Sequence, residues 1–220
     1  MEMINNKHVF WQALVVTLVI FFGGIILGVW FEEGRVDKFR QFYYSSETNL
    51  FDIMLQQQVL EKGNFSCDLV VESGILLADK IYYEARELEK YDSANKISDE
   101  AFRLHRKYDL LRTFLWNSLI DKQEKCRRDF NVAVYLYQYK EPSVDTHAKQ
   151  AAMSKVLLDL KKKYGDKVIL IPIAYDSEIK SLDYLRIRYN LAEDRPYVII
   201  NQDKIITELN SVEELEKYLR

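Results

Sequence analysis

The sequence predicts an α+β protein with three consecutive parts: an apolar N-terminal helix, a long helical middle, and a C-terminal region of alternating strands and helices. Three observations lead to this prediction. One apolar stretch lies near the N-terminus, residues 35–128 contain two glycines and no proline, and short apolar runs replace helical spacing from about residue 131. The predicted parts are a tail over 1–8, a transmembrane helix over 9–30, a helical bundle over 31–130 and an α/β domain over 131–220.

Composition narrows the class of protein. The chain has 220 residues, is 48% hydrophobic and carries a net charge of −3, which excludes a disordered chain. Only two cysteines are present, so a disulfide-rich scaffold and a zinc site made of four thiolates are excluded. Because nucleic-acid binding needs clustered Lys and Arg, no nucleic-acid partner is expected.

The segment from Val9 to Trp30 is expected to cross a membrane. Its only strongly polar side chain is Gln12, and about 20 apolar residues span a hydrocarbon core of about 30 Å. Cleaved signal peptides have a shorter apolar run of about 7–15 residues followed by small residues. The segment is therefore interpreted as an uncleaved signal anchor, with the lipid bilayer as its partner.

Gly24 and Gly28 form a G-x-x-x-G pair inside this span. Small residues at this spacing let two helices approach closely, so the pair is a candidate homodimer face. The alternative is that glycine is simply common in membrane helices.

The middle of the chain predicts three helices, over 36–61, 67–91 and 98–126. Apolar residues recur along one side of each helix at roughly coiled-coil spacing, which favours an antiparallel three-helix bundle serving as a stalk. The residues on these sides are Phe39, Tyr43, Ser46, Leu50, Ile53, Gln57 and Leu60; Val70, Leu77, Ile81, Ala85 and Leu88; and Ala101, Leu104, Tyr108, Leu111 and Leu115.

The two cysteines lie at the ends of the second and third helices. Cys67 begins one and Cys126 closes the other, so an antiparallel arrangement brings them side by side. We therefore expect a disulfide between them; two separate buried cysteines are the alternative.

The orientation in the membrane rests on two opposed signals. Arg35, Lys38 and Arg40 follow the span and only Lys7 precedes it, which by the positive-inside rule places the C-terminal part in the cytoplasm. A disulfide persists outside the cytosol and favours the reverse. The prediction adopted is a cytoplasmic N-terminus and an extracytoplasmic C-terminal region.

The C-terminal region predicts strands over 131–138, 168–175, 196–200 and 205–209 and helices over 145–164, 179–190 and 211–219. The first strand is apolar almost throughout, as a strand buried on both faces is. Ser211 and Glu214 are expected to form a capping box. The side chains of helix 145–164 expected to face inward are Ala148, Ala151, Ala152, Val156, Leu157 and Leu160.

This order, β-α-β-α-β-β-α, resembles the thioredoxin-like fold over residues 131–220. The stretch Tyr189-Asn190-Leu191 and then Arg195-Pro196 before an apolar strand is similar to the family's approach to its cis-proline. Pro172 fits an edge strand, and a hairpin followed by a helix closes the chain as in the family. The resemblance implies that Arg195 and Pro196 form a loop that binds a peptide partner through its backbone.

The chain departs from the family at the Cys-x-x-Cys motif, whose positions are occupied by Val144 and His147. Neither residue supports thiol–disulfide exchange, so no enzymatic activity and no cofactor are expected. Ser143, Asp145 and His147 are too close along the chain to form a catalytic triad, and Ser143 or Asp145 is expected to cap the helix. No metal site is expected, and His105 and Asp109 are interpreted as a pair on a helix surface.

The function expected from these observations is binding or scaffolding at a membrane surface, by an anchored, redox-inactive thioredoxin-like protein whose protein or peptide partner is not specified by the sequence. The alternative is a participant in a thiol–disulfide pathway that uses Cys67 and Cys126 or accompanies an active oxidoreductase. A third possibility is a spacer whose head domain only caps the stalk.

Overall fold

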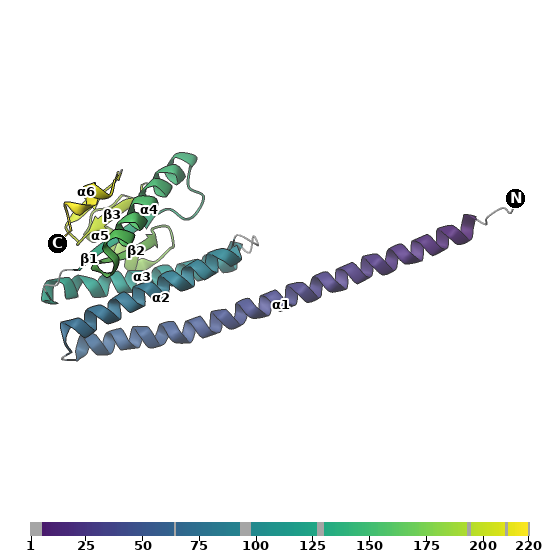
Figure 1. The fold of residues 1–220 in the computed structure, drawn as a ribbon, viewed down its shortest axis with the longest axis horizontal. Helices are drawn as coiled ribbons and strands as arrows, with labels where there is room; N and C mark the ends of the chain where they lie inside the picture. Colours follow the sequence, from purple (N-terminus) through teal and green to yellow (C-terminus); the bar gives the residue numbers. More distant parts are fainter. Residues whose placement is uncertain are drawn as a thin grey trace. The chain divides into compact units, whose positions relative to one another are not determined.

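A computed structural model describes residues 6–63, 65–92, 98–126, 130–192, 195–209 and 211–219. The protein is α+β and mostly helical, with one mixed four-stranded sheet (Figure 1). It divides into two compact units, Met1–Asp52 and Ile53–Arg220. The elements are α1 (Asn6–Lys62), α2 (Cys67–Asp92), α3 (Ser98–Cys126), β1 (Asn131–Tyr137), α4 (Val144–Tyr164), the 3-10 turn η1 (Gly165–Lys167), β2 (Val168–Ala174), α5 (Lys180–Arg188), β3 (Tyr197–Ile200), β4 (Lys204–Ile206) and α6 (Val212–Glu216).

The N-terminal part of α1 is apolar and exposed. Its 23 residues Val9–Phe31 have a mean hydropathy of 2.6, so the segment is long and apolar enough to cross a membrane. A Cβ atom at Gly24 or Gly28 would meet nothing within 4 Å, and the dimer face stays a prediction. The side chains of four residues on the expected coiled-coil side of α1 lie outside those described: Phe39, Tyr43, Ser46 and Leu50.

Helices α2 and α3 form an antiparallel hairpin. Gly74 lies against Leu119, whose Cδ2 atom would be 3.2 Å from a Cβ at position 74, and Tyr108 donates a 3.4 Å hydrogen bond to Glu84. The predicted apolar sides are buried along the described part: Val70, Leu77, Ile81, Ala85, Leu104, Tyr108, Leu111 and Leu115. The side chains of Leu88 and Ala101 lie outside the described residues.

The last turns of α1 pack against this hairpin through a buried polar contact. Gln57 is fully buried; its Nε2 donates to Ser73 Oγ at 2.9 Å, and Lys122 Nζ donates to its Oε1 at 2.6 Å. These bonds satisfy an amide that would otherwise destabilise the interior. The C-terminal end of α1 therefore belongs to the second compact unit.

The sheet has the strand order β2-β1-β3-β4, with β1 parallel to β2 and the other neighbours antiparallel. The predicted order of strands and helices is confirmed, as is the burial of β1 on both faces. Strand β2 is an edge strand, as Pro172 predicted. Because Tyr175 N donates to Tyr137 O at 2.8 Å, alternation along β2 directs Pro172 toward the open edge, where its missing N–H breaks no ladder bond.

Two helical layers cover the sheet. On one face, α4 and α6 close a core around Tyr135, Met153, Leu157, Val198 and Leu215. On the other face, α3 and part of α2 pack over β2, and α5 lies beside α3. Trp116 of α3 stacks on Tyr189 just after α5, with 5.4 Å between ring centroids.

The hairpin is thus part of the sheet domain, whereas the sequence predicts a separate stalk that ends at residue 130. The apolar side chains on the second face of the sheet are the physical reason. Helix α5 has only nine residues, too few to cover all of them, so α2 and α3 complete that layer. The buried residues of this face are Val132, Val134, Leu136, Ile169, Ile171, Ile173, Tyr197 and Ile199.

The inward side of α4 was predicted only in part. Leu157 and Leu160 are buried as expected and Val156 is half-buried. Ala148, Ala151 and Ala152 are exposed instead, and the other buried positions of α4 are Gln150 and Met153. Alanine favours a helix on any face, so its spacing was a poor guide to the inward side.

The half of the predicted capping box at α6 that Ser211 supplies does not form. Ser211 makes no cap hydrogen bond to the helix backbone. Two hydrogen bonds hold the pKa of the Glu213 carboxyl below its usual range. The larger effect comes from the backbone N–H of Glu213, and the smaller comes from the Ser211 hydroxyl.

Asn201 joins four parts of the second unit. Its Oδ1 accepts from Val132 N and from Gln123 Nε2, each at 3.0 Å, and its Nδ2 donates to Asn131 Oδ1 at 2.7 Å and to Tyr218 O at 3.1 Å. Its φ of 50° lies in the left-handed region, which asparagine tolerates better than most residues. One side chain thus ties α3, β1, the β3–β4 turn and the C-terminus.

Replacing Asn201 is expected to destabilise the protein strongly. Asn201→Ala removes four buried hydrogen bonds and places alanine at positive φ, so we expect a loss of about 2–4 kcal/mol in the free energy of unfolding. Chemical unfolding of the full chain in detergent measures it. The matched control is Asp203→Ala in the same turn, an exposed position; equal losses for both variants would contradict this role of Asn201.

Candidate functional site

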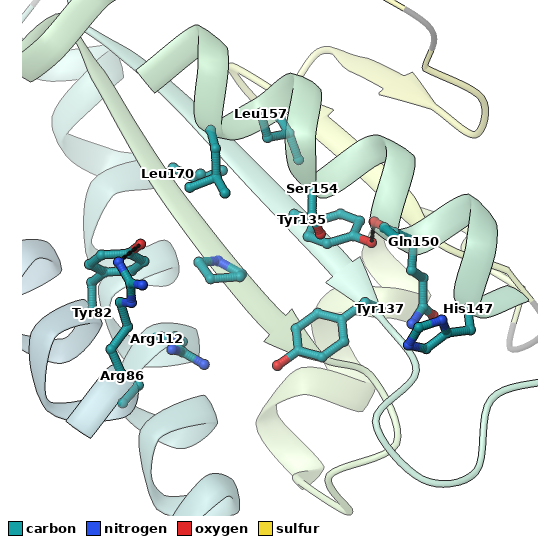
Figure 2. A pocket seen from close by; sticks show the side chains of 14 residues that line it. Tyr82, Arg86, Arg112, Tyr135, Tyr137, His147, Gln150, Ser154, Leu157 and Leu170 are labelled. Carbon is teal, nitrogen blue, oxygen red and sulfur yellow. Dashed lines mark hydrogen bonds between the residues drawn. The ribbon is translucent and has the colours of Figure 1, made fainter. Parts of the chain in front are cut away.

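A hollow lies at the open edge of β2, between the α2–α3 layer and α4. It has a volume of about 460 Å³ and draws side chains from five elements (Figure 2). Its lining residues are Tyr82, Ala85 and Arg86 of α2, Arg112 of α3, Tyr135 and Tyr137 of β1, Leu170 and Pro172 of β2, and His147, Gln150, Ala151, Ser154, Leu157 and Leu158 of α4. We call this hollow the edge pocket. Its size is within the range of small-molecule sites, about 300–1,000 Å³.

Two stacked tyrosines form one side of the edge pocket. The rings of Tyr135 and Tyr137 are 5.6 Å apart, and Tyr135 donates to Gln150 O at 3.1 Å. Burial raises the pKa of Tyr135 to about 12, and a hydrogen bond with Ser154 only partly offsets this. Tyr135 is therefore a neutral phenol at physiological pH and contributes aromatic surface.

Gln150 fixes the first turns of α4 to the end of β1. Its Oε1 accepts from Gln138 N at 2.8 Å and its Nε2 donates to Gln138 O at 3.0 Å. This paired contact holds the backbone of β1 and the wall of the pocket together. A polar residue, Gln150, is thus buried on α4 at a position that the predicted inward side did not include.

Two arginines line the opposite side of the edge pocket (Figure 2). Arg86 is exposed; its Nη1 lies 3.4 Å from the Tyr82 hydroxyl and its guanidinium carbon lies 5.7 Å from the Tyr82 ring centroid. Arg112 is buried and donates from Nη1 to Asp109 Oδ1 at 3.2 Å. Asp and Glu are absent from the described residues that line the pocket.

A buried acidic residue, Asp109, contacts Arg112 from outside the pocket lining. Asp109 is fully buried, accepts a hydrogen bond from the Ser177 hydroxyl, and its Oδ2 lies 2.9 Å from His105 Nδ1, an ion pair when the imidazole is protonated. His105 Nε2 in turn lies 2.9 Å from the Tyr137 hydroxyl. The cluster connects α3 to the ends of β1 and β2.

The pair of His105 and Asp109 predicted from the sequence is therefore present, but its predicted place on a helix surface is wrong. Asp109 faces the sheet because α3 packs over β2 with the side of the helix that carries this residue. No group of three His, Cys, Asp or Glu side chains that could hold a metal occurs in the part of the chain that the structure describes.

The two positions that stand for the missing cysteines differ in their surroundings. Val144 begins α4 and is 90% exposed, whereas His147 lines the edge pocket. Ser143 caps α4 by accepting from Thr146 N at 3.2 Å, as expected, and Asp145 pairs with Lys149 at 2.8 Å. Ser143 and Asp145 thus have other partners, and no nucleophile–base pair forms there.

The predicted cis-proline is wrong. No cis peptide bond occurs among the described residues, and the bond between Arg195 and Pro196 is trans. Trans is favoured by about 0.5–1 kcal/mol unless tertiary contacts impose cis. The partner-binding loop inferred for Arg195 and Pro196 depended on the cis geometry and loses its basis.

The cysteines are placed as expected along the chain. Cys67 begins α2 and Cys126 ends α3, and Cys67 has no free thiol. The side chain of Cys126 lies outside the described residues, so the bond between the two stays a prediction.

Sequence patterns did not indicate Arg86, Arg112, Tyr137 or Gln150. Each is unremarkable in its own segment, and they meet only because α2 and α4 flank the same edge strand. Two residues that the sequence singled out do line the pocket. Pro172 indicated an open edge, and His147 indicated a position of the missing Cys-x-x-Cys motif, but neither indicated what surrounds the edge.

Asp109 is expected to be essential to this region's stability. Asp109→Asn removes the negative charge and leaves Arg112 buried without its counter-ion, so we expect a loss of about 3–5 kcal/mol. Ser177→Ala removes one hydrogen bond and is expected to cost about 1 kcal/mol. Chemical unfolding of the full chain compares the variants; a loss below about 1 kcal/mol for Asp109→Asn would refute the role of this carboxylate.

No family model, curated protein or solved structure matches this chain.

Proposed function

We propose that the chain is a single-pass membrane protein whose second unit is a thioredoxin-like binding module without thiol chemistry. The apolar helix Val9–Phe31 supports the anchor. The order of elements and the edge position of β2 support the fold assignment. A homodimer through Gly24 and Gly28 is the accompanying expectation for the membrane helix.

The edge pocket is the observation that carries the binding role. Side chains from both helical layers converge on one hollow of ordinary ligand-binding size. Arg86, Arg112 and Tyr137 lie toward one end of it, and Leu157 and Leu170 lie toward the other (Figure 2). Val144 and His147 replace the family's thiols, and no nucleophile is paired with a base at the start of α4. Binding without covalent chemistry is what such a site supports.

The register of α2 and α3 supports the disulfide and the orientation. Position 74 faces 119 and position 84 faces 108, so the same antiparallel register brings position 126 opposite Cys67. A disulfide there belongs to an oxidising compartment, which favours a cytoplasmic N-terminus. Cys67 has no free thiol, so the alternative role in thiol exchange requires a thiol of another molecule to open its disulfide.

Loss of either cysteine is expected to destabilise the protein equally. Closing a loop of about 60 residues stabilises by about 2–4 kcal/mol, so Cys67→Ser, Cys126→Ser and the double variant should unfold at similar, lower temperatures. Thermal unfolding of the full chain with and without reductant measures this. Both thiols reacting with an alkylating reagent in native, unreduced protein would show that the bond is absent.

Filling the edge pocket is expected to abolish binding. Ala151 lines the pocket and Ala152 does not, although both are exposed positions of α4. Ala151→Trp should therefore remove molecules that co-purify with the full chain, whereas Ala152→Trp should retain them, as measured by native mass spectrometry from nanodiscs. Identical sets of bound molecules in the wild type and both variants would reject the pocket as the binding site.

A further inference from the structure

We infer that the edge pocket takes a small amphipathic carboxylate, that is, one carboxylate group on an apolar body. This inference rests on the proposed binding function and names the class of ligand. It follows from the charges at one end of the pocket, the apolar surface at the other, and the chemistry of the β2 edge.

The polar end of the pocket favours an anion. Arg86 and Arg112 both line it, and no described lining residue is acidic. Guanidinium groups bind carboxylates through paired, charge-assisted hydrogen bonds. The Tyr137 hydroxyl and His147 lie across from the two arginines (Figure 2) and add polar groups at the same end. A cationic ligand would meet two like charges there.

The balance of charge favours a single negative charge. Arg112 is already paired with the buried carboxylate of Asp109 at 3.2 Å, so these two charges cancel. Arg86 contacts the hydroxyl and ring of Tyr82, which are uncharged. Of the two arginines among the described lining residues, Arg86 therefore keeps its positive charge uncompensated by any described carboxylate, and one ligand carboxylate balances it. A dianion such as a phosphate monoester would bring an excess negative charge beside Asp109.

The other end of the pocket favours an apolar body. Leu157 and Leu170 lie there, away from the two arginines (Figure 2). The pocket lining also includes Ala85, Leu158 and Pro172. A second hollow of about 250 Å³ shares Tyr82, Leu158 and Leu170 with the edge pocket; its other lining residues are Ile75, Ala78 and Ile169 and the charged Asp79, Lys161 and Lys162. Burial of apolar surface stabilises by about 25 cal/mol per Å², so an aryl or alkyl group gains free energy along this wall.

The β2 edge itself disfavours the other occupant of an open strand, an extended peptide. Pro172 faces this edge and has no N–H to donate, so a docked strand would lose a ladder hydrogen bond at the centre of β2. Helix α2 also packs against β2, and Tyr82 and Arg86 extend to its edge. These groups leave a pocket with a charged end, which suits a small molecule better than an added strand.

The test uses the full chain in lipid nanodiscs with fluorine NMR, and empty nanodiscs as the blank. The probes are 4-(trifluoromethyl)benzoate, its neutral amide, and 4-(trifluoromethyl)phenylphosphonate. We expect the benzoate to bind about tenfold more tightly than the amide, which corresponds to about 1.4 kcal/mol, and more tightly than the phosphonate.

Arg86→Gln is the informative variant, since Arg86 is exposed and its loss leaves no buried charge unpaired. It should lower the affinity for the benzoate about tenfold and leave the affinity for the amide unchanged. Arg86→Lys should be intermediate, because lysine keeps the charge but not the paired geometry. Arg103→Gln is the matched control: Arg103 is an exposed arginine on α3 outside the pocket lining, and its loss should change neither affinity.

Four results would overturn the inference. If the phosphonate binds more tightly than the benzoate, the pocket prefers a doubly charged ligand. If the amide binds as tightly as the benzoate, the pocket does not recognise the negative charge. Equal losses for Arg86→Gln and Arg103→Gln would place the anion elsewhere. If no probe binds while Ala151→Trp still removes the co-purified molecules, the ligand class is wrong but the binding function stands; if Ala151→Trp has no effect either, the proposed function itself fails.

Discussion

Burial of the central strand on both faces is the constraint on which the rest of the second unit depends. Strand β1 is buried along Asn131–Leu136, so a helical layer must lie on each side of the sheet. Helices α4 and α6 supply one layer. The nine-residue α5 is too short to supply the other, and the α2–α3 hairpin completes it, which makes the hairpin and the sheet parts of one compact unit.

Two buried polar residues fix the position of the α2–α3 hairpin on the sheet, which apolar contacts alone would allow to shift. Asn201 ties α3 to β1 and to the C-terminus through directional hydrogen bonds, and Asp109 ties α3 to the loop after β2 and to Arg112. Apolar packing tolerates small shifts, whereas a buried amide or carboxylate that loses its partners is costly. Such residues select one docking of the hairpin on the sheet.

The edge pocket follows from the same architecture. Helix α4 packs on the centre of its face, so Leu170 and Pro172 at the β2 edge are only partly covered, and α2 brings Tyr82 and Arg86 to that edge from the other layer. The edge pocket forms because the α4 layer and the α2–α3 layer both end at the uncovered edge of β2. Its charge comes from Arg86, because Asp109 already neutralises Arg112, and this asymmetry sets the ligand class that we propose.

The sequence by itself determined the elements that depend on local patterns. The apolar N-terminal helix, the bounds of α2 and α3, the burial of β1 and the cap at Ser143 follow from hydrophobic spacing and from side-chain chemistry within a few residues. Only the tertiary structure decided which layer the hairpin joins, that Asp109 is buried, that the bond before Pro196 is trans, and that Arg86, Arg112 and Tyr137 share one pocket. These features depend on contacts between segments far apart in the chain, and the residues that make them carry no local signal, because what each side chain faces is set by how helices and strands pack and not by its neighbours in sequence.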